Sequence, residues 1–164
     1  MRPNYLLVGL VCLIFFTISL VTNILGSLMP EMIRTFAISL GLAGFLPFAF
    51  FVAYGVMSIP SGMLIERFRE KAVIATAFTI ACAGALAFAV LPEFRVALAS
   101  LFLIGIGMAM LQVAINPLLR VAGGEQHFAF NSVLAQLVFG LASYISPKIY
   151  QYFVGDLSLH WSSV

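Results

Sequence analysis

Residues 96–119 read VALASLFLIGIGMAMLQVAINPLL, an uncharged run of 24 residues. About 20 consecutive apolar residues are enough for a helix to cross the hydrocarbon core of a bilayer, so this run predicts a transmembrane helix. The rest of the 164-residue chain has the same character, since 63% of its residues are hydrophobic and only 9% are charged, where a soluble domain has about 25% charged residues. This composition excludes an ordinary soluble enzyme, a nucleic-acid-binding protein and a disordered chain.

Four other apolar runs accompany this one, and clusters of charged residues separate them. The predicted spans cover about residues 5–28, 40–65, 72–91, 96–119 and 128–153. In lipid every backbone polar group must be bonded internally, which only helices and closed barrels achieve. These runs are about twice as long as barrel strands and do not alternate in polarity. We therefore expect an all-α, polytopic membrane bundle of five transmembrane helices over residues 1–154, followed by a polar tail over residues 155–164.

The positive charges in the loops predict the orientation of the bundle, because Lys and Arg are enriched in cytoplasmic loops. With the N-terminus in the cytoplasm, the inner side carries Arg2, Arg67, Arg69, Lys71 and Arg120, and the outer side carries Arg34, Arg95 and Lys148. Five charges against three favour this orientation. An odd number of spans then places the C-terminus outside.

Polar residues inside the spans are the candidates for function. Gln112 and Asn116 are four residues apart in the predicted helix 96–119, so they share one face, and Gly105 and Ala109 continue that face. Two interpretations stay open from the residues alone. The stripe is either a close helix–helix contact held by amide hydrogen bonds or the wall of a cavity that binds a polar solute.

Three further residues join these candidates, namely Asn23, Tyr54 and Gln136. Serine and threonine side chains, such as those of Ser19 and Ser143, are expected to bond the backbone of their own helix instead. No Asp, Glu, Lys, Arg or His lies in the central part of a predicted span, and such residues mark proton and ion paths in membranes. We expect no catalytic residue, no metal site and no cofactor, because no nucleophile–base pair or ligand cluster stands out.

A charged loop joins the predicted spans 40–65 and 72–91. It resembles the loop motif G-x-x-x-(D/E)-R-x-G-R-(K/R) of the major facilitator superfamily, which four of its residues match: Gly62, Glu66, Arg67 and Lys71. Arg69 stands where the motif has Gly, and Glu70 stands where it has Arg. The resemblance implies that this loop gates the conformational change of a transporter.

The string LQVAINP at residues 111–117 resembles a narrower group, the fucose:proton symporter family, whose glucose/galactose branch carries L-Q-V-A-x-N-P there. The stretch FFVAYGVMSIPSGMLIERF at residues 50–68 is similar to the same family. The resemblance implies that Asn116 lies in a helix lining the sugar cavity, and that Gln112 and Asn23 replace two membrane carboxylates of the fucose permease. An amide hydrogen-bonds sugar hydroxyls but does not titrate, so the coupling ion, proton or sodium, stays open.

The resemblance implies transport of a monosaccharide of the fucose, glucose or galactose type across a bacterial inner membrane. The sugar-binding residues would be Gln112, Asn116, Asn23, Tyr54 and Gln136.

Transporters of this superfamily have two six-helix halves, so we expect these five spans to be an N-terminal part, cut near residues 155–164, that does not transport alone. Expected partners are the sugar, a coupling ion, lipid and the missing C-terminal half, with no nucleic acid. Two alternatives stay open: a carrier of drugs or other metabolites in the same superfamily, and an inactive structural membrane fragment.

Overall fold

The computed structural model describes residues 4–91 and 93–156, and nearly all of them are helical. In chain order the elements are α1 (Tyr5–Phe36), α2 (Leu40–Ala43), α3 (Phe45–Val90), α4 (Phe94–Gly123), η1 (Glu125–His127), α5 (Phe128–Tyr150) and η2 (Gln151–Asp156). No strand occurs within the described ranges. The predicted all-α class is confirmed, whereas most of the predicted polar tail 155–164 and the N-terminal Arg2 lie outside the described residues.

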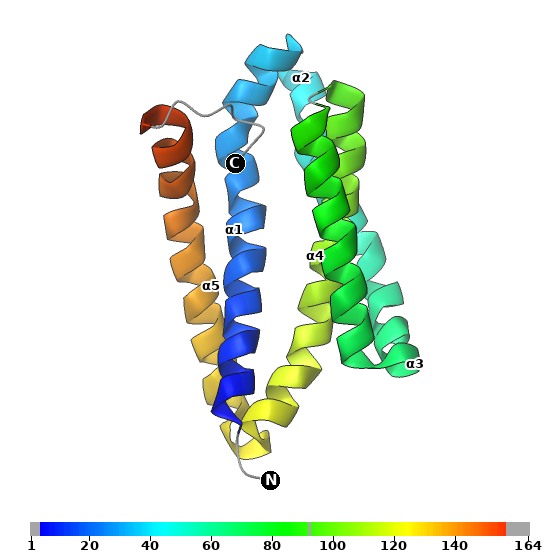
Figure 1. Cartoon of the computed structure of the whole chain (residues 1–164), viewed down its shortest axis with the longest axis vertical. Helices are drawn as coiled ribbons and strands as arrows, with labels where there is room; N and C mark the ends of the chain where they lie inside the picture. The colour runs from blue at the N-terminus through cyan, green and yellow to red at the C-terminus, as the bar shows by residue number, and fades with distance from the viewer. Residues whose placement is uncertain (1–3, 92, 157–164) are drawn as a thin grey trace.

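Helix α3 is a hairpin of two helical legs (Figure 1). The chain reverses at Arg69, whose φ of 64° and ψ of 157° are non-helical. The two legs correspond to the predicted spans 40–65 and 72–91. Each leg has about 20 residues, which at a rise of about 1.5 Å per residue covers about 30 Å, the thickness of a bilayer's hydrocarbon core.

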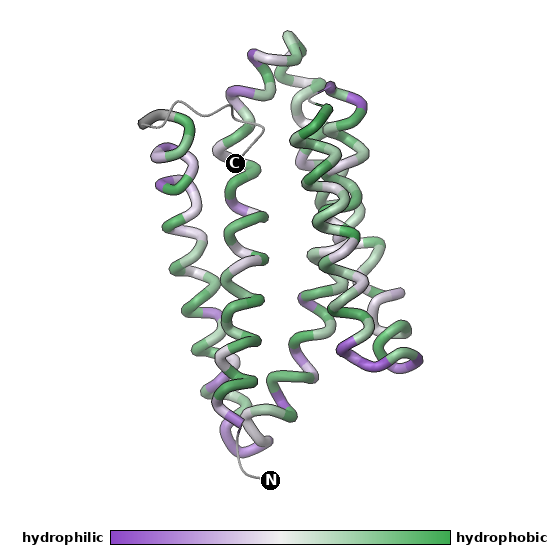
Figure 2. Tube along the Cα trace, in the orientation of Figure 1, coloured by the Kyte–Doolittle hydropathy of each residue, from purple (hydrophilic) through white to green (hydrophobic). Residues whose placement is uncertain are grey.

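The described chain contains four helical stretches that are long and apolar enough to cross a membrane: Tyr5–Phe36, Leu40–Val90, Phe94–Gly123 and Glu125–Val154. Leu40–Val90 counts once, but its 51 residues include both legs of the hairpin. The four stretches therefore correspond to the five predicted spans, because the two legs of α3 are counted as one stretch and as two spans. Figure 2 shows hydrophilic residues gathered toward the ends of the bundle, including the bend of α3, with a predominantly hydrophobic middle.

Helix α1 is longer than the predicted span 5–28. It continues through Pro30 to Phe36, because the one backbone donor that a proline removes need not end a membrane helix. The helix ends where Ala37 adopts left-handed angles, with φ of 50° and ψ of 39°. The N–H of Ala37 then donates to the carbonyl oxygen of Arg34, which satisfies one of the last carbonyls of the helix.

Helix α4 packs against both legs of α3, and glycines allow the close approach. A Cβ added at Gly107 would lie 2.7 Å from the carbonyl oxygen of Ala77 and 2.8 Å from the Cβ of Ala81, both on the second leg. A Cβ added at Gly105 would collide with the carbonyl oxygen of Phe50 on the first leg. Since small residues let helix backbones pack closely in membranes, α3 and α4 form one tightly packed unit.

Helices α1 and α5 lie side by side as a second unit (Figure 1). α1 also contacts α4, and the N–H of Asn4 donates to the carbonyl oxygen of Ala122 at 2.8 Å. This hydrogen bond lies at the end of the bundle where the N-terminus is marked in Figure 1. The two units are therefore tied together at that end.

Candidate functional site

The first leg of α3 and helix α4 each contribute a polar side chain to one hydrogen bond. The hydroxyl of Tyr54 donates to Oε1 of Gln112. Both residues are half-buried, and the Tyr54 ring also packs against Phe50, with ring centroids 6.1 Å apart. The bond consumes the single proton of the tyrosine and one acceptor site of the amide, so Nε2 of Gln112 keeps both its N–H groups for another partner.

Asn116 lies one helical turn beyond Gln112 and is exposed. Its Nδ2 donates to the backbone carbonyl oxygen of Gln112 at 3.1 Å. This bond holds the side chain along its own helix and leaves Oδ1 free of any described protein donor. The structure thus links three of the five predicted sugar-binding residues through Gln112, which bonds Tyr54 of α3 on one side and Asn116 on the next turn of α4 on the other.

Asn23 belongs to a different hydrogen-bond network, which joins α1 to α5. Its Oδ1 accepts a hydrogen bond from the hydroxyl of Ser143 at 2.9 Å, and its Nδ2 donates to the backbone carbonyl of Ser19 at 2.8 Å and to the Ser19 hydroxyl at 3.3 Å. The Ser19 hydroxyl itself donates to the carbonyl oxygen of Phe139 at 2.6 Å. Nearby, the hydroxyl of Ser146 donates to the carbonyl oxygen of Leu20 at 2.9 Å.

The expectation that Ser19 and Ser143 bond only their own helix is wrong, because both donate across the α1–α5 contact. Thr22 and Ser58 do behave as expected, donating to the carbonyl oxygens four residues earlier. One pattern in the sequence does indicate which serine bonds across a helix contact rather than to its own helix. Ser19 and Asn23 are four residues apart and so share one face of α1.

Gln136 is exposed on α5. No hydrogen bond joins it to another described residue of the predicted set. It therefore stands apart both from the Tyr54–Gln112 pair and from the Asn23 network.

The predicted gating residues lie around the bend of α3. Glu66, Arg67 and Lys71 are exposed and Gly62 is half-buried. The guanidinium carbon of Arg67 lies 5.3 Å from the centre of the Phe68 ring, within the range of a cation–π contact. No ion pair among the described residues involves these charges, so within the described chain they are available to a further partner.

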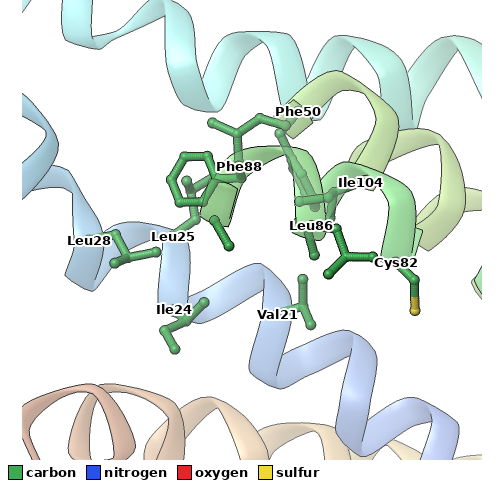
Figure 3. A pocket seen from close by; sticks show the side chains of 12 residues that line it. Val21, Ile24, Leu25, Leu28, Phe50, Cys82, Leu86, Phe88 and Ile104 are labelled. Atoms are coloured by element: carbon green, nitrogen blue, oxygen red, sulfur yellow. The ribbon is translucent and has the colours of Figure 1, made fainter. Parts of the chain in front are cut away.

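A cavity of about 480 Å³ opens between α1 and the α3–α4 unit, and its lining is almost entirely apolar. Figure 3 shows Val21, Ile24 and Leu28 of α1 facing Phe88 and Ile104 across it. None of the five predicted sugar-binding residues lines this cavity. Sequence reasoning missed it, because helices far apart in the sequence supply its lining and no polar side chain marks it.

The described residues contain no group of three or more His, Cys, Asp or Glu side chains that could hold a metal ion. Cys12 and Cys82 are free thiols within that part of the chain.

Comparison with known proteins gives consistent relatives. Residues 11–164 match the sequence profile of the Major Facilitator Superfamily. The L-fucose-proton symporter of Escherichia coli is 32% identical over 131 residues, which are 78% of this chain and 30% of the relative. A glucose/galactose transporter of Brucella abortus is 29% identical over 138 residues, which are 82% of this chain and 34% of the relative.

A solved structure agrees with these sequence relatives. The crystal structure of a variant of the Escherichia coli fucose:proton symporter matches 97% of this chain and 38% of its own, with a TM-score of 0.75 and 27% sequence identity. This chain thus spans about a third of the length of the relatives that it matches. The resemblance to the fucose:proton symporter branch is confirmed, and the chain belongs to the major facilitator superfamily.

Proposed function

We propose that this chain supplies one wall of the sugar-binding site of a monosaccharide transporter. The observation that carries the proposal is the hydrogen bond between Tyr54 and Gln112, with Asn116 exposed one turn away. Together they present unused amide donors and acceptors on one face of the α3–α4 unit. Amides of this kind replace the hydration shell of a sugar's hydroxyl groups, and the names of the relatives, which transport fucose, glucose or galactose, support a sugar as the solute.

Asn23 and Gln136 enter the proposal in secondary roles. Asn23 already bonds protein partners through both amide atoms, and Nδ2 donates to both the carbonyl oxygen and the hydroxyl of Ser19, so it mainly fixes α1 against α5. Gln136 would meet the sugar only from the exposed side of α5. We therefore rank Gln112 and Asn116 ahead of both.

Transport itself is proposed only for a longer assembly. Alternating access requires two helix bundles that rock about a site between them, and this chain spans about a third of its relatives. The bend of α3, with Glu66 and Arg67 exposed, would contact the second bundle in one conformation and release it in the other. In this proposal the N-terminus and the bend face the cytoplasm, and the membrane is a bacterial inner membrane.

Neither Gln112 nor Asn23 can take up and release a coupling proton, because an amide does not ionise near neutral pH. A proton-coupled mechanism therefore requires a titratable side chain, such as a carboxylate, elsewhere in the assembly. Sodium coupling requires oxygen ligands instead, and uniport requires neither.

Direct sugar binding tests the proposal. The chain is placed in lipid nanodiscs, and binding of radiolabelled galactose and fucose is measured by equilibrium dialysis. We expect saturable binding that weakens at least about tenfold in Gln112→Leu or Asn116→Leu, since each substitution removes the hydrogen bonds of one amide. Gln126→Leu, which changes an exposed amide in η1, is the matched control and should bind as the wild type does. Absence of saturable binding, or equal binding by all variants, would refute the proposal.

The apolar cavity supports one rival function, a carrier of an apolar compound in the same superfamily. Its lining of aliphatic and phenylalanine side chains would suit such a compound better than a sugar. Adding an apolar fluorescent dye to the same nanodiscs separates the two functions. Under the sugar proposal the dye leaves sugar binding unchanged, and under the rival the dye binds saturably while the sugar does not.

A further inference from the structure

The hydrogen bonds around Gln112 and Asn116 orient their two amides in opposite senses. Since the hydroxyl of Tyr54 donates to Oε1 of Gln112, the amide is turned so that Nε2 is the end left for a ligand. At Asn116 the bond runs the other way, because Nδ2 donates to the backbone carbonyl oxygen of Gln112 at 3.1 Å. The end left with its full capacity at Asn116 is therefore the oxygen, Oδ1.

The pair thus has a polarity that its residue types alone do not fix. A glutamine and an asparagine can each donate and accept. In this arrangement Gln112 offers both of its N–H donors and one lone pair of its oxygen, whereas Asn116 offers both lone pairs of its oxygen and one N–H. Residues four apart on a helix have Cβ atoms only about 5–6 Å apart, so one ligand can reach both.

We propose that Tyr54 is a positioning residue which, through Gln112, makes the site selective for a solute with neighbouring hydroxyl groups of opposite hydrogen-bonding sense. One hydroxyl accepts from Nε2 of Gln112, and its neighbour donates to Oδ1 of Asn116. This inference rests on the proposed sugar-binding function and deepens it. A pair of hydroxyl groups satisfies the arrangement by rotation about its two C–O bonds, which points each O–H as required. A pair of ether oxygens would leave Oδ1 of Asn116 without a donor, and a pair of ammonium groups would leave Nε2 of Gln112 without an acceptor.

The direction of the hydrogen bonds also strengthens them. In the bound state the donors run in one sense, from Gln112 through the first hydroxyl to the second hydroxyl and on to Asn116. Hydrogen bonds that follow one another in this way polarise each other. The tyrosine hydroxyl begins the series at the protein end, since it polarises the Gln112 amide and makes its N–H groups better donors.

Fluorinated sugars test this directly, because fluorine in place of a hydroxyl can still accept weakly but cannot donate. Binding of the single-position deoxy and deoxyfluoro galactoses is measured with the chain in nanodiscs. At the ring position over Gln112, we expect the deoxy sugar to lose about tenfold in affinity and the deoxyfluoro sugar to lose about threefold or less. At the position over Asn116, both analogues should lose about tenfold.

Two variants separate positioning from packing. Tyr54→Phe keeps the ring but frees the amide, so we expect the deoxyfluoro preference at the first position to shrink to about twofold or less, while Tyr144→Phe, an exposed tyrosine on α5, leaves it unchanged. Gln112→Glu keeps the Tyr54 partner but exchanges the donor for an acceptor, so the fluoro analogue should become the worse ligand at that position.

The outcomes distinguish this inference from the function on which it rests. If the wild type binds galactose but never distinguishes fluorine from hydrogen, or if Tyr54→Phe keeps the full preference, the inference is overturned and sugar binding stands. If the wild type shows no saturable binding, the proposed function fails and the inference fails with it. If Tyr54→Phe does not fold, Gln112→Glu decides: a preserved fluoro preference overturns the inference, and a reversed one supports it.

Discussion

Replacing Arg69 by glycine should stabilise the protein. Arg69 reverses the chain between the two legs of α3 with φ of 64° and ψ of 157°, a backbone region that is almost restricted to glycine. Holding another residue there costs about 1–3 kcal/mol. Arg69 also stands where the loop motif of the superfamily carries Gly, so the residue that this conformation favours is the one that the motif specifies.

The expected gain follows from this strain. If Arg69→Gly recovers about 1–2 kcal/mol of the strain, the melting temperature of a chain of this size should rise by about 2–8 °C. Circular dichroism of the chain in a mild detergent measures the transition. The substitution breaks no described ion pair that would offset this gain in stability, because Arg69 is exposed and takes part in neither ion pair of the described residues.

Arg67→Gly is the matched control, since it makes the same chemical change two residues earlier in a helical segment. Glycine in a helix interior costs about 1 kcal/mol, so this variant should melt at a lower temperature than the wild type. The reasoning fails if Arg69→Gly melts at or below the temperature of the wild type, or if both substitutions shift the melting temperature in the same direction.

Three other substitutions test the packing of the two units by the same melting assay. Gly107→Ala should destabilise the protein by about 1–3 kcal/mol, because its Cβ would lie 2.7 Å from the carbonyl oxygen of Ala77. Its control is Gly55→Ala, whose added Cβ would have no atom within 4 Å, so this variant should be neutral or stabilising. Equal effects of the two substitutions would contradict this packing. Ser100→Ala should be neutral or stabilising by up to about 1 kcal/mol, because the Ser100 hydroxyl is buried without a partner among the described residues; a marked loss would mean that the hydroxyl is bonded. Ser143→Ala should cost about 0.6–1.7 kcal/mol by breaking the 2.9 Å bond to Asn23, and unchanged stability would remove that bond from the account.

Helix formation and the membrane class follow from the sequence because they depend on local quantities. The length of each apolar run and the positions of the charges are enough to predict a helical bundle, and the described helices agree. The ends of the helices were harder to predict. The run of α1 through Pro30 to Phe36 depends on how neighbouring groups satisfy the backbone around a proline, which the sequence does not state.

The candidate site was predictable only within single helices. Gln112 and Asn116 share a face because they are four residues apart, and the structure places them on successive turns. The partnership of Gln112 with Tyr54 joins residues 58 positions apart, and the bond from Ser143 to Asn23 joins residues 120 positions apart. Such pairings depend on which helices are neighbours. The sequence therefore predicts most of the polar residues that take part, but not which of them bond to one another.

The structure also separates what the sequence grouped. The five predicted sugar-binding residues were one set by residue type, yet Asn23 lies in the α1–α5 network and Gln136 lies exposed on α5. The apolar cavity between the two units was not predicted at all. The side chains that line it are of the same apolar types as side chains that face lipid. Only the tertiary arrangement places them around a cavity.

Nuclear magnetic resonance of the glutamine side chains tests the central claim most directly. The chain contains four glutamines, Gln112, Gln126, Gln136 and Gln151, so labelling glutamine with nitrogen-15 gives four side-chain amide signals to follow in nanodiscs. We predict that galactose or fucose shifts the Gln112 signal saturably and leaves those of Gln126 and Gln151 in place. A titration in which the Gln112 signal does not move, or in which all four signals drift together, would contradict the account.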